Sequence, residues 1–181
     1  MINVRQFMES KDPVLWEDEW LAIKQVDGWY TYSHSIKSDG KGVAVLAYCK
    51  EPSLKVLGRY ENTPCHGDGV ALASLTGMVD HGGEGELETA VRELEEEAGV
   101  VADKENFKDL GTSRPSKSSD TTMYLYAVEV EFKEGKLTGS GDGTKGEDGA
   151  YCKFVSLKDA IESKDPILAT MVARLLTREL I

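Results

Sequence analysis

The alternation of apolar and polar positions along the chain predicts a series of short strands around one long helix. The first two apolar runs are separated by Asp27-Gly28, which suits a type I′ hairpin turn because both positions tolerate positive φ. Residues 43–49 are nearly continuously apolar, as in a strand that is buried on both faces. The strands are predicted at residues 20–26, 29–36, 43–49, 54–60, 70–75, 107–112, 121–132 and 151–155.

Helical periodicity is confined to three segments. The helices are predicted at residues 86–98, 157–162 and 166–180. The first has an apolar stripe of Leu87, Val91, Leu94 and Ala98, and Gly99 ends it. The last has Asp165 as N-cap and Pro166 at its first helical position.

The order of these elements indicates a mixed α/β or α+β domain preceded by a small β element. We expect the N-terminal β element at residues 1–40 and the main domain at residues 41–181. Residues 135–149 are rich in glycine and polar side chains, so a mobile loop is expected there.

Composition narrows the classes of function. The chain has 32 Asp and Glu against 21 Lys and Arg, a net charge of −11, which argues against nucleic-acid binding. No apolar run approaches the roughly 20 residues of a membrane span, and the start has no apolar signal core, so we expect a cytoplasmic protein. The cysteines show no zinc-ligand or disulfide spacing.

The candidate metal-binding residues are concentrated in the predicted helix at residues 86–98. Helical geometry places Glu93, Glu96 and Glu97 on one narrow face, roughly 120° from the apolar stripe. Carboxylates gathered in this way suit Mg²⁺ or Mn²⁺, with Glu84 as a fourth oxygen ligand and Arg92 as a group that orients a glutamate. On these residues alone, an ordinary solvated acidic face remains the alternative.

The full segment closely resembles the Nudix box, a loop-helix-loop metal site. Every fixed position of that motif is matched at the family spacing from Glu84 to Val100. One departure is present, because six residues separate Gly77 from Glu84 where the family has five. This insertion lengthens the loop before Glu84 by one residue and leaves the helix ligands intact.

The resemblance implies the Nudix fold, an α/β/α sandwich of the α+β class with a mixed sheet. It implies Mg²⁺-dependent hydrolysis of a nucleoside diphosphate linked to another moiety. The metal ligands would be Glu93, Glu96, Glu97, Glu84 and the backbone carbonyl of Thr76. The catalytic set would be Glu96, Glu97 and Arg92, with a loop glutamate, Glu147, as general base. Asp148 or a box glutamate are the alternatives for that base.

Pro115, about fifteen residues after the box, is similar to a proline of the ADP-ribose pyrophosphatase branch. In that branch the N-terminal strands often exchange across a homodimer and stack aromatic rings on adenine. The resemblance therefore makes Trp29 and Tyr30 candidates for substrate binding. Glu61 stands where relatives usually have a phosphate-binding arginine, so Arg59 or Arg114 is the expected substitute.

Several functions are left open by the sequence. The first is hydrolysis of ADP-ribose to AMP and ribose 5-phosphate. Other Nudix substrates are nucleotide sugars, dinucleoside polyphosphates, NADH and oxidised nucleotides. A Nudix-fold module that senses nucleotides without hydrolysing them is the alternative from another class.

Overall fold

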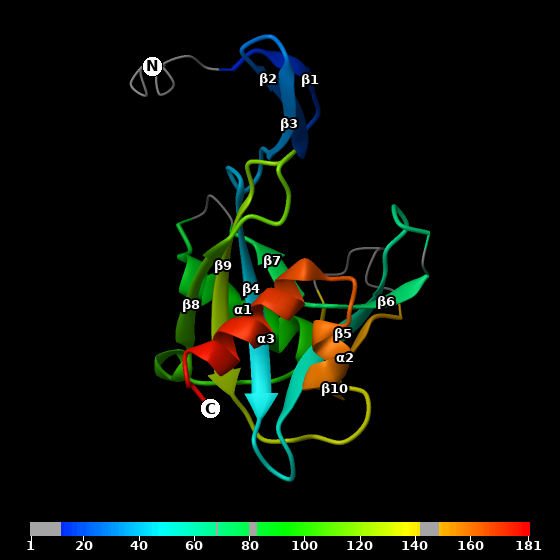
Figure 1. The fold of residues 1–181 in the computed structure, drawn as a ribbon, viewed down its shortest axis with the longest axis vertical. Coiled ribbons are helices and arrows are strands. Elements are labelled where there is room, and N and C mark those ends of the chain that lie inside the picture. The colour runs from blue at the N-terminus through cyan, green and yellow to red at the C-terminus, as the bar shows by residue number, and fades with distance from the viewer. Residues whose placement is uncertain (1–11, 68, 80–82, 142–148) are drawn as a thin grey trace.

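The computed structural model describes residues 12–67, 69–79, 83–141 and 149–181. Within these ranges, three strands form a small sheet and seven form a larger one, with helices packed on the larger sheet (Figure 1). The small sheet consists of β1 (Val14–Glu17), β2 (Leu21–Val26) and β3 (Tyr30–Ser35). The larger sheet consists of β4 (Lys41–Cys49), β5 (Lys55–Asn62), β6 (Val70–Ala73), β7 (Leu75–Met78), β8 (Lys108–Ser113), β9 (Thr122–Glu129) and β10 (Tyr151–Ser156). The helices are α1 (Glu86–Ala98), a short 3₁₀ turn η2 (Lys104–Asn106), α2 (Leu157–Ile161) and α3 (Pro166–Thr177).

The central strand β4 is buried on both faces, as its apolar run predicts. Its side chains alternate between two separate cores because successive residues of a strand point to opposite faces. One core contains Ala44, Leu46 and Tyr48 with the apolar residues of α3. The other contains Val43, Val45 and Ala47 with those of α1. The α/β/α sandwich is therefore confirmed.

The larger sheet is mixed and divides at one end. Its order is β10-β5-β4-β9-β8, with β4 and β9 parallel and the neighbouring pairs antiparallel. β4 and β5 are paired only at Tyr48↔Val56 and Cys49↔Lys55, after which β7 pairs with β4 and β6 with β5. The single strand predicted at 70–75 is wrong, because the strand is interrupted at Ser74 and the chain changes partner strand there.

One carboxylate binds the residue at this interruption. Asp165 Oδ2 accepts hydrogen bonds from the backbone N–H and from Oγ of Ser74, both at 2.6 Å. Its other oxygen accepts from the N–H groups of Ile167 and Leu168, which confirms the predicted N-cap of α3. A single residue therefore begins α3 and joins it to the point where the sheet divides.

The predicted hairpin is present as β2 and β3. Asp27 and Gly28 have φ of 53° and 74°, in the left-handed region that the turn requires. The register pairs Val26 with Tyr30, so the connection includes Trp29 and is one residue longer than predicted. β1 was not predicted, because all its residues are exposed and no alternation marks it.

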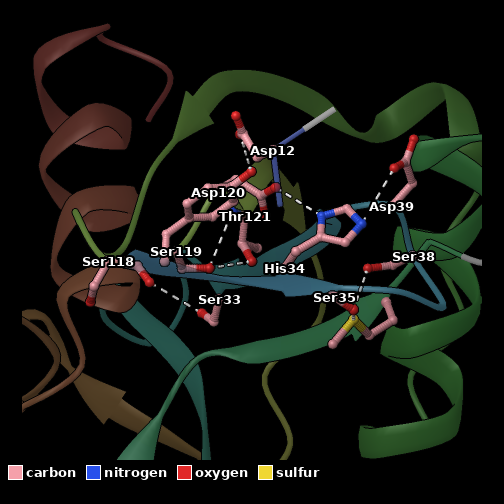
Figure 2. Close-up of polar contacts among 12 residues, drawn as sticks. Asp12, Ser33, His34, Ser35, Ser38, Asp39, Ser118, Ser119, Asp120 and Thr121 are labelled. Carbon is pink, nitrogen blue, oxygen red and sulfur yellow. Dashed lines mark hydrogen bonds and ion pairs between the residues drawn. The ribbon is translucent and has the colours of Figure 1, made fainter. Parts of the chain in front are cut away.

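The small sheet projects from one end of the molecule (Figure 1) and is held by the connection between β8 and β9. Figure 2 shows two of these contacts: Oγ of Ser33 donates to the carbonyl of Ser118 at 3.2 Å, and Nδ1 of His34 lies 2.8 Å from Asp120 Oδ2. The backbone N–H of Ser33 donates to the same carbonyl at 2.8 Å. The N-terminal element therefore has a defined position next to residues 114–120. The predicted domain boundary at residue 40 stays a prediction.

None of the helices in the described ranges is both long enough and apolar enough to span a membrane.

Replacement of Asp165 by alanine removes the α3 cap and the acceptor for Ser74 together. We expect Asp165→Ala to lower the free energy of unfolding by about 2–4 kcal/mol, since a cap and a charged hydrogen bond are both lost. Urea denaturation measures this change. Asp103→Ala is the control, because Asp103 precedes η2 without a side-chain cap bond; its loss should stay within about 0.5 kcal/mol. Equal effects of the two variants would contradict the assigned role.

Candidate functional site

Helix α1 carries the predicted metal-binding carboxylates and matches its predicted bounds. Gly99 ends it in the left-handed conformation, at φ 62°, and donates its N–H to the carbonyl of Glu95. The buried positions are Thr89, Ala90, Leu94 and Ala98. The predicted stripe is thus partly wrong, because Leu87 and Val91 are only half-buried and the helix is turned toward Thr89 and Ala90.

This rotation brings two carboxylates against the sheet. The side chain of Glu93 is 12% exposed and that of Glu97 only 8%. Glu96 is more accessible and lies at the edge of the same region. An ordinary solvated acidic face would leave all three in water, so the structure argues against that alternative.

Arg92 forms ion pairs on one side of the carboxylate cluster, which consists of Glu93, Glu96 and Glu97. Its guanidinium contacts Glu93 at 2.9 Å, Glu84 at 3.2 Å and Glu96 at 2.5 Å. Burial alone would lower the pKa of Arg92, but the carboxylates of Glu93, Glu84 and Glu96 outweigh it and raise the pKa above its ordinary value. Arg92 therefore orients several glutamates at once, where the sequence predicted that it would orient one.

Arg59 forms an ion pair with Glu97 on the other side of this cluster. It lies on β5 and is only 5% exposed. Its Nη1 is 2.9 Å from Glu97 Oε1, and its Nε is 2.9 Å from Glu61 Oε2. The sequence made Arg59 a candidate for phosphate binding; the structure brings it to a predicted metal ligand.

Gly77 allows β7 to approach the cluster. A Cβ at this position would lie 2.1 Å from the carboxylate carbon of Glu93, so any other residue here would displace the Glu93 side chain. Thr76, whose carbonyl is the predicted backbone ligand, precedes it and pairs with Ala44 of β4. Glu84 accepts from the hydroxyl of Thr89 at 3.2 Å, which ties the loop to the first turn of α1.

The donor chemistry at this site fits a hard divalent cation. Glu93, Glu96 and Glu97 present only carboxylate oxygens, which suit Mg²⁺ or Mn²⁺. Across the described part of the chain, no group of three or more His, Cys, Asp or Glu side chains is arranged to hold a metal ion. Arg92 and Arg59 supply the positive charge to these glutamates instead.

A short segment at residues 137–141, which we call the strap, covers the end of α1. The N–H of Gly139 donates to the carbonyl of Glu97 at 3.2 Å, and that of Gly141 to the carbonyl of Glu96 at 2.9 Å. The strap satisfies carbonyls that a helix end leaves unpaired. This part of the predicted mobile loop is therefore packed, and sequence reasoning missed it. Glu147 and Asp148 lie outside the described residues, so the general base stays a prediction.

Cys152 lies beneath the same helix end. Its Sγ is 3.6 Å from the carbonyl of Glu97. Burial, followed by the nearby charge of Glu97, raises the pKa of the Cys152 thiol to about 12. The group therefore remains a protonated thiol at neutral pH and contributes packing, with no nucleophilic role.

Some predicted substrate-binding residues come together in a second region. A cavity of about 510 Å³ is lined by Tyr30, Arg114, Pro115, Ser116, Lys117 and Ser119. The hydroxyl of Tyr30 donates to the carbonyl of Lys117, which fixes the ring at the cavity wall. Trp29 lies edge-on to Tyr30 and is 75% exposed, outside the lining. Arg59 is not part of this cavity either.

Comparisons with known proteins agree with this architecture. The family model for the NUDIX domain matches residues 40–175. A solved structure described as the crystal structure of ADP compounds hydrolase is similar with a TM-score of 0.63. The match covers 94% of this chain and 91% of that chain at 17% sequence identity, which is a likeness of fold. No curated protein matches the chain.

The strap gives a prediction about Gly139. A Cβ there would lie 2.1 Å from the backbone carbonyl of Glu96, so Gly139→Ala must displace the strap. We expect a loss of about 1–3 kcal/mol in the free energy of unfolding, the usual cost of overpacking. Urea denaturation measures the loss, and hydrogen exchange at the Gly141 amide reports the displaced bond. Ser140→Ala, an exposed neighbour, is the control; a Gly139 variant as stable as this control would refute the packing described.

Proposed function

The chain belongs to the NUDIX domain family, and on this premise we propose that it hydrolyses the diphosphate linkage of ADP-ribose or of a similar nucleoside diphosphate joined to another moiety. The products from ADP-ribose would be AMP and ribose 5-phosphate. Magnesium is the proposed cofactor, with manganese as a substitute of the same ligand preference.

The observation that carries this proposal is the nearly buried pair of carboxylates on α1. Glu93 and Glu97 lie against the sheet with arginine partners. Charge is costly to bury, so a structure keeps it there only where it is matched. A site that gathers matched carboxylates at the position of the family motif supports metal-dependent chemistry.

We assign Glu93, Glu96 and Glu97 as metal ligands, with the backbone carbonyl of Thr76 and with Glu84 as further oxygen donors. When bound, the metal polarises phosphate oxygens, lowers the pKa of the attacking water and neutralises charge on the leaving phosphate. Arg92 fixes the orientation of the glutamates through its three carboxylate contacts. Glu96 and Glu97 are the catalytic glutamates of the proposal.

The cavity lined by Tyr30, Arg114 and Pro115 is the proposed site for the nucleoside end of the substrate. Its volume lies in the range of small-molecule pockets. Arg114 and Lys117 offer positive charge to phosphate, and the ring of Tyr30 offers a stacking face for a purine. The name of the structural neighbour, an ADP compounds hydrolase, supports an adenine nucleotide.

A nucleotide-sensing module is the second candidate. It is favoured by one observation, namely that arginines neutralise the box glutamates in the described structure. If those ion pairs persist with nucleotide present, the protein would bind its ligand without turnover. An assay of nucleotide turnover separates the two functions.

The hydrolysis prediction is tested with Mg²⁺ and a panel of ADP-ribose, nucleotide sugars, dinucleoside polyphosphates, NADH and oxidised nucleotides. We expect the unmodified protein to release a mononucleotide. Glu97→Gln should lower kcat by about a hundredfold or more, which is the scale of losing one group that stabilises the transition state electrostatically. Arg114→Ala should instead raise KM about tenfold with little change in kcat, because it removes binding rather than chemistry.

Glu129→Gln is the matched control for charge, since Glu129 pairs with Lys50 outside the site. Tight nucleotide binding with no product from the unmodified protein would favour the sensor. Turnover that survives in Glu97→Gln would refute the proposed metal site.

We also propose a homodimer formed through the small sheet. Its outer strand β1 pairs only with β2 in the described structure, so its other edge offers free backbone groups. Leu15, Trp16 and Trp20 are more than half exposed on this sheet. An exposed apolar group of this kind marks an interaction surface.

Sedimentation equilibrium tests the dimer. We expect Trp16→Asp to weaken self-association at least about tenfold, since aromatic anchors dominate interfaces. Val101→Asp is the control, because Val101 is equally apolar and exposed but lies after α1. A monomeric wild-type protein, or equal effects of both variants, would rule out this interface.

A further inference from the structure

The cavity proposed for the nucleoside lies between two segments that are distant along the chain. Tyr30 belongs to β3, and the other lining residues, from Arg114 to Ser119, belong to the connection between β8 and β9. This connection lies along β3 like a short added strand, with Ser119 in a parallel bridge to Ser33. The shape of the cavity therefore depends on how firmly the connection is attached to β3.

Backbone hydrogen bonds supply part of this attachment. The N–H of Ser33 donates to the carbonyl of Ser118 at 2.8 Å, and the N–H of Asp120 donates to the carbonyl of Ser33 at 3.2 Å. Because water competes for such bonds, each of them contributes only modestly to the attachment. A charged side-chain contact at the same place adds to it.

His34 supplies this contact. Along β3 it alternates with Tyr30, so both side chains point to the same face of the strand. Its Nδ1 is 2.8 Å from Asp120 Oδ2, and its Nε2 is 3.8 Å from Asp39 Oδ1 (Figure 2). The His34 side chain is 13% exposed and that of Asp39 is 69% exposed, so Asp120 is the stronger partner.

Asp120 is also packed against the turn before β4. A Cβ at position 40 would lie 3.1 Å from Asp120 Oδ1, so Gly40 leaves close space for this carboxylate. The N–H of Thr122 donates to the carbonyl of Gly40 at 2.8 Å. The Asp120 carboxylate therefore joins His34 of the small sheet to the start of β9.

Protonation changes what His34 can donate. A neutral imidazole has one N–H donor, whereas the imidazolium has two and carries a positive charge. The other titratable groups that the described structure places beside Asp120 are Tyr32 and Asp12, whose hydroxyl and Oδ2 are 2.7 Å apart. Burial, the hydrogen bond to Asp12 and the charges of Asp12 and Asp120 raise the pKa of Tyr32, so its hydroxyl stays neutral. Histidine is the group of this set that ordinarily changes its charge between about pH 5 and 8.

We propose that His34 is a positioning residue for the nucleoside site, which acts through Asp120 to hold the connection that carries Arg114 and Pro115 against β3. The protonated imidazole pairs with both Asp120 and Asp39, so it holds the connection more firmly than the neutral form does. The affinity for the nucleoside end of the substrate therefore falls as the pH rises. The inference rests on the proposed function, in which this cavity binds the nucleoside.

Two measurements on the full chain without metal test this role. Hydrogen exchange at the Ser33 and Asp120 amides reports the attachment in the absence of any ligand. Calorimetric titration with ADP-ribose reports the affinity of the cavity. At about pH 6 we expect His34→Ala to lower the protection of both amides and to weaken ADP-ribose binding about tenfold, the scale of losing a charged hydrogen bond. His66→Ala is the control, because His66 is exposed and lies outside the cavity lining; equal effects of the two variants would overturn the proposal.

The pH dependence separates this role from a purely structural one. Between about pH 6 and 8, the ADP-ribose affinity and the amide protection of the wild-type protein, corrected for the intrinsic exchange rate, should each fall about threefold. His34→Asn keeps an uncharged N–H donor that does not titrate, so its values should stay constant over this range. A fall of the same size in wild type and His34→Asn would overturn the role of the proton.

A double-mutant cycle separates an action through Asp120 from a direct effect of His34 on the ligand. In the Asp120→Ala background, His34→Ala should change ADP-ribose affinity by less than about twofold. An undiminished effect there would overturn the positioning role. Asp120→Asn, which removes the charge of the more exposed partner, serves if His34→Ala does not fold; it should abolish most of the fall with pH, and an unchanged fall would refute the proposal.

The two proposals fail in different ways. A wild-type protein that binds and hydrolyses ADP-ribose, with unchanged affinity and amide protection in His34→Ala, would overturn this inference alone. A wild-type protein that neither binds nor hydrolyses any compound of the panel would overturn the proposed function and the inference with it.

Discussion

The carboxylates of Glu93 and Glu97 lie where the sheet excludes water, and their charge must be matched by the protein. This requirement constrains several elements at once. β5 supplies Arg59 to Glu97, and α1 supplies Arg92 to Glu93 and its neighbours. β7 has glycine at position 77, where a Cβ would displace the Glu93 carboxylate from its present position. The site is therefore a property of helix and sheet together.

The C-terminal end of α1 is also held by contacts from other segments. Its last carbonyls belong to the same residues whose side chains form the cluster, and the strap binds them through Gly139 and Gly141. The protonated thiol of Cys152 also contacts the carbonyl of Glu97. Movement of the strap would therefore act on the backbone of Glu96 and Glu97. This arrangement links the loop after β9 to the proposed metal ligands.

The proposed metal site and the proposed nucleoside site occupy different parts of the fold. The glutamates stand on α1 against the larger sheet, whereas Tyr30, Arg114 and Pro115 form a cavity where the small sheet meets the connection before β9. Contacts from Ser33 and His34 hold these two segments together. The proposed function therefore assigns substrate preference to residues at the small sheet and metal binding to the carboxylate cluster of α1.

The sequence alone determined the bounds of α1, the doubly buried β4, the Asp165 cap and the family motif, because each is encoded by neighbouring residues with a fixed period or spacing. It did not determine the rotation of α1 or the change of partner strand at Ser74. It also did not determine β1, which has no buried face to produce a pattern. The sequence also did not reveal that Arg59 is an ion-pair partner of Glu97. Arg59 and Glu97 are distant along the chain, and their pairing follows from the register of β5 beneath the helix, which only tertiary packing decides.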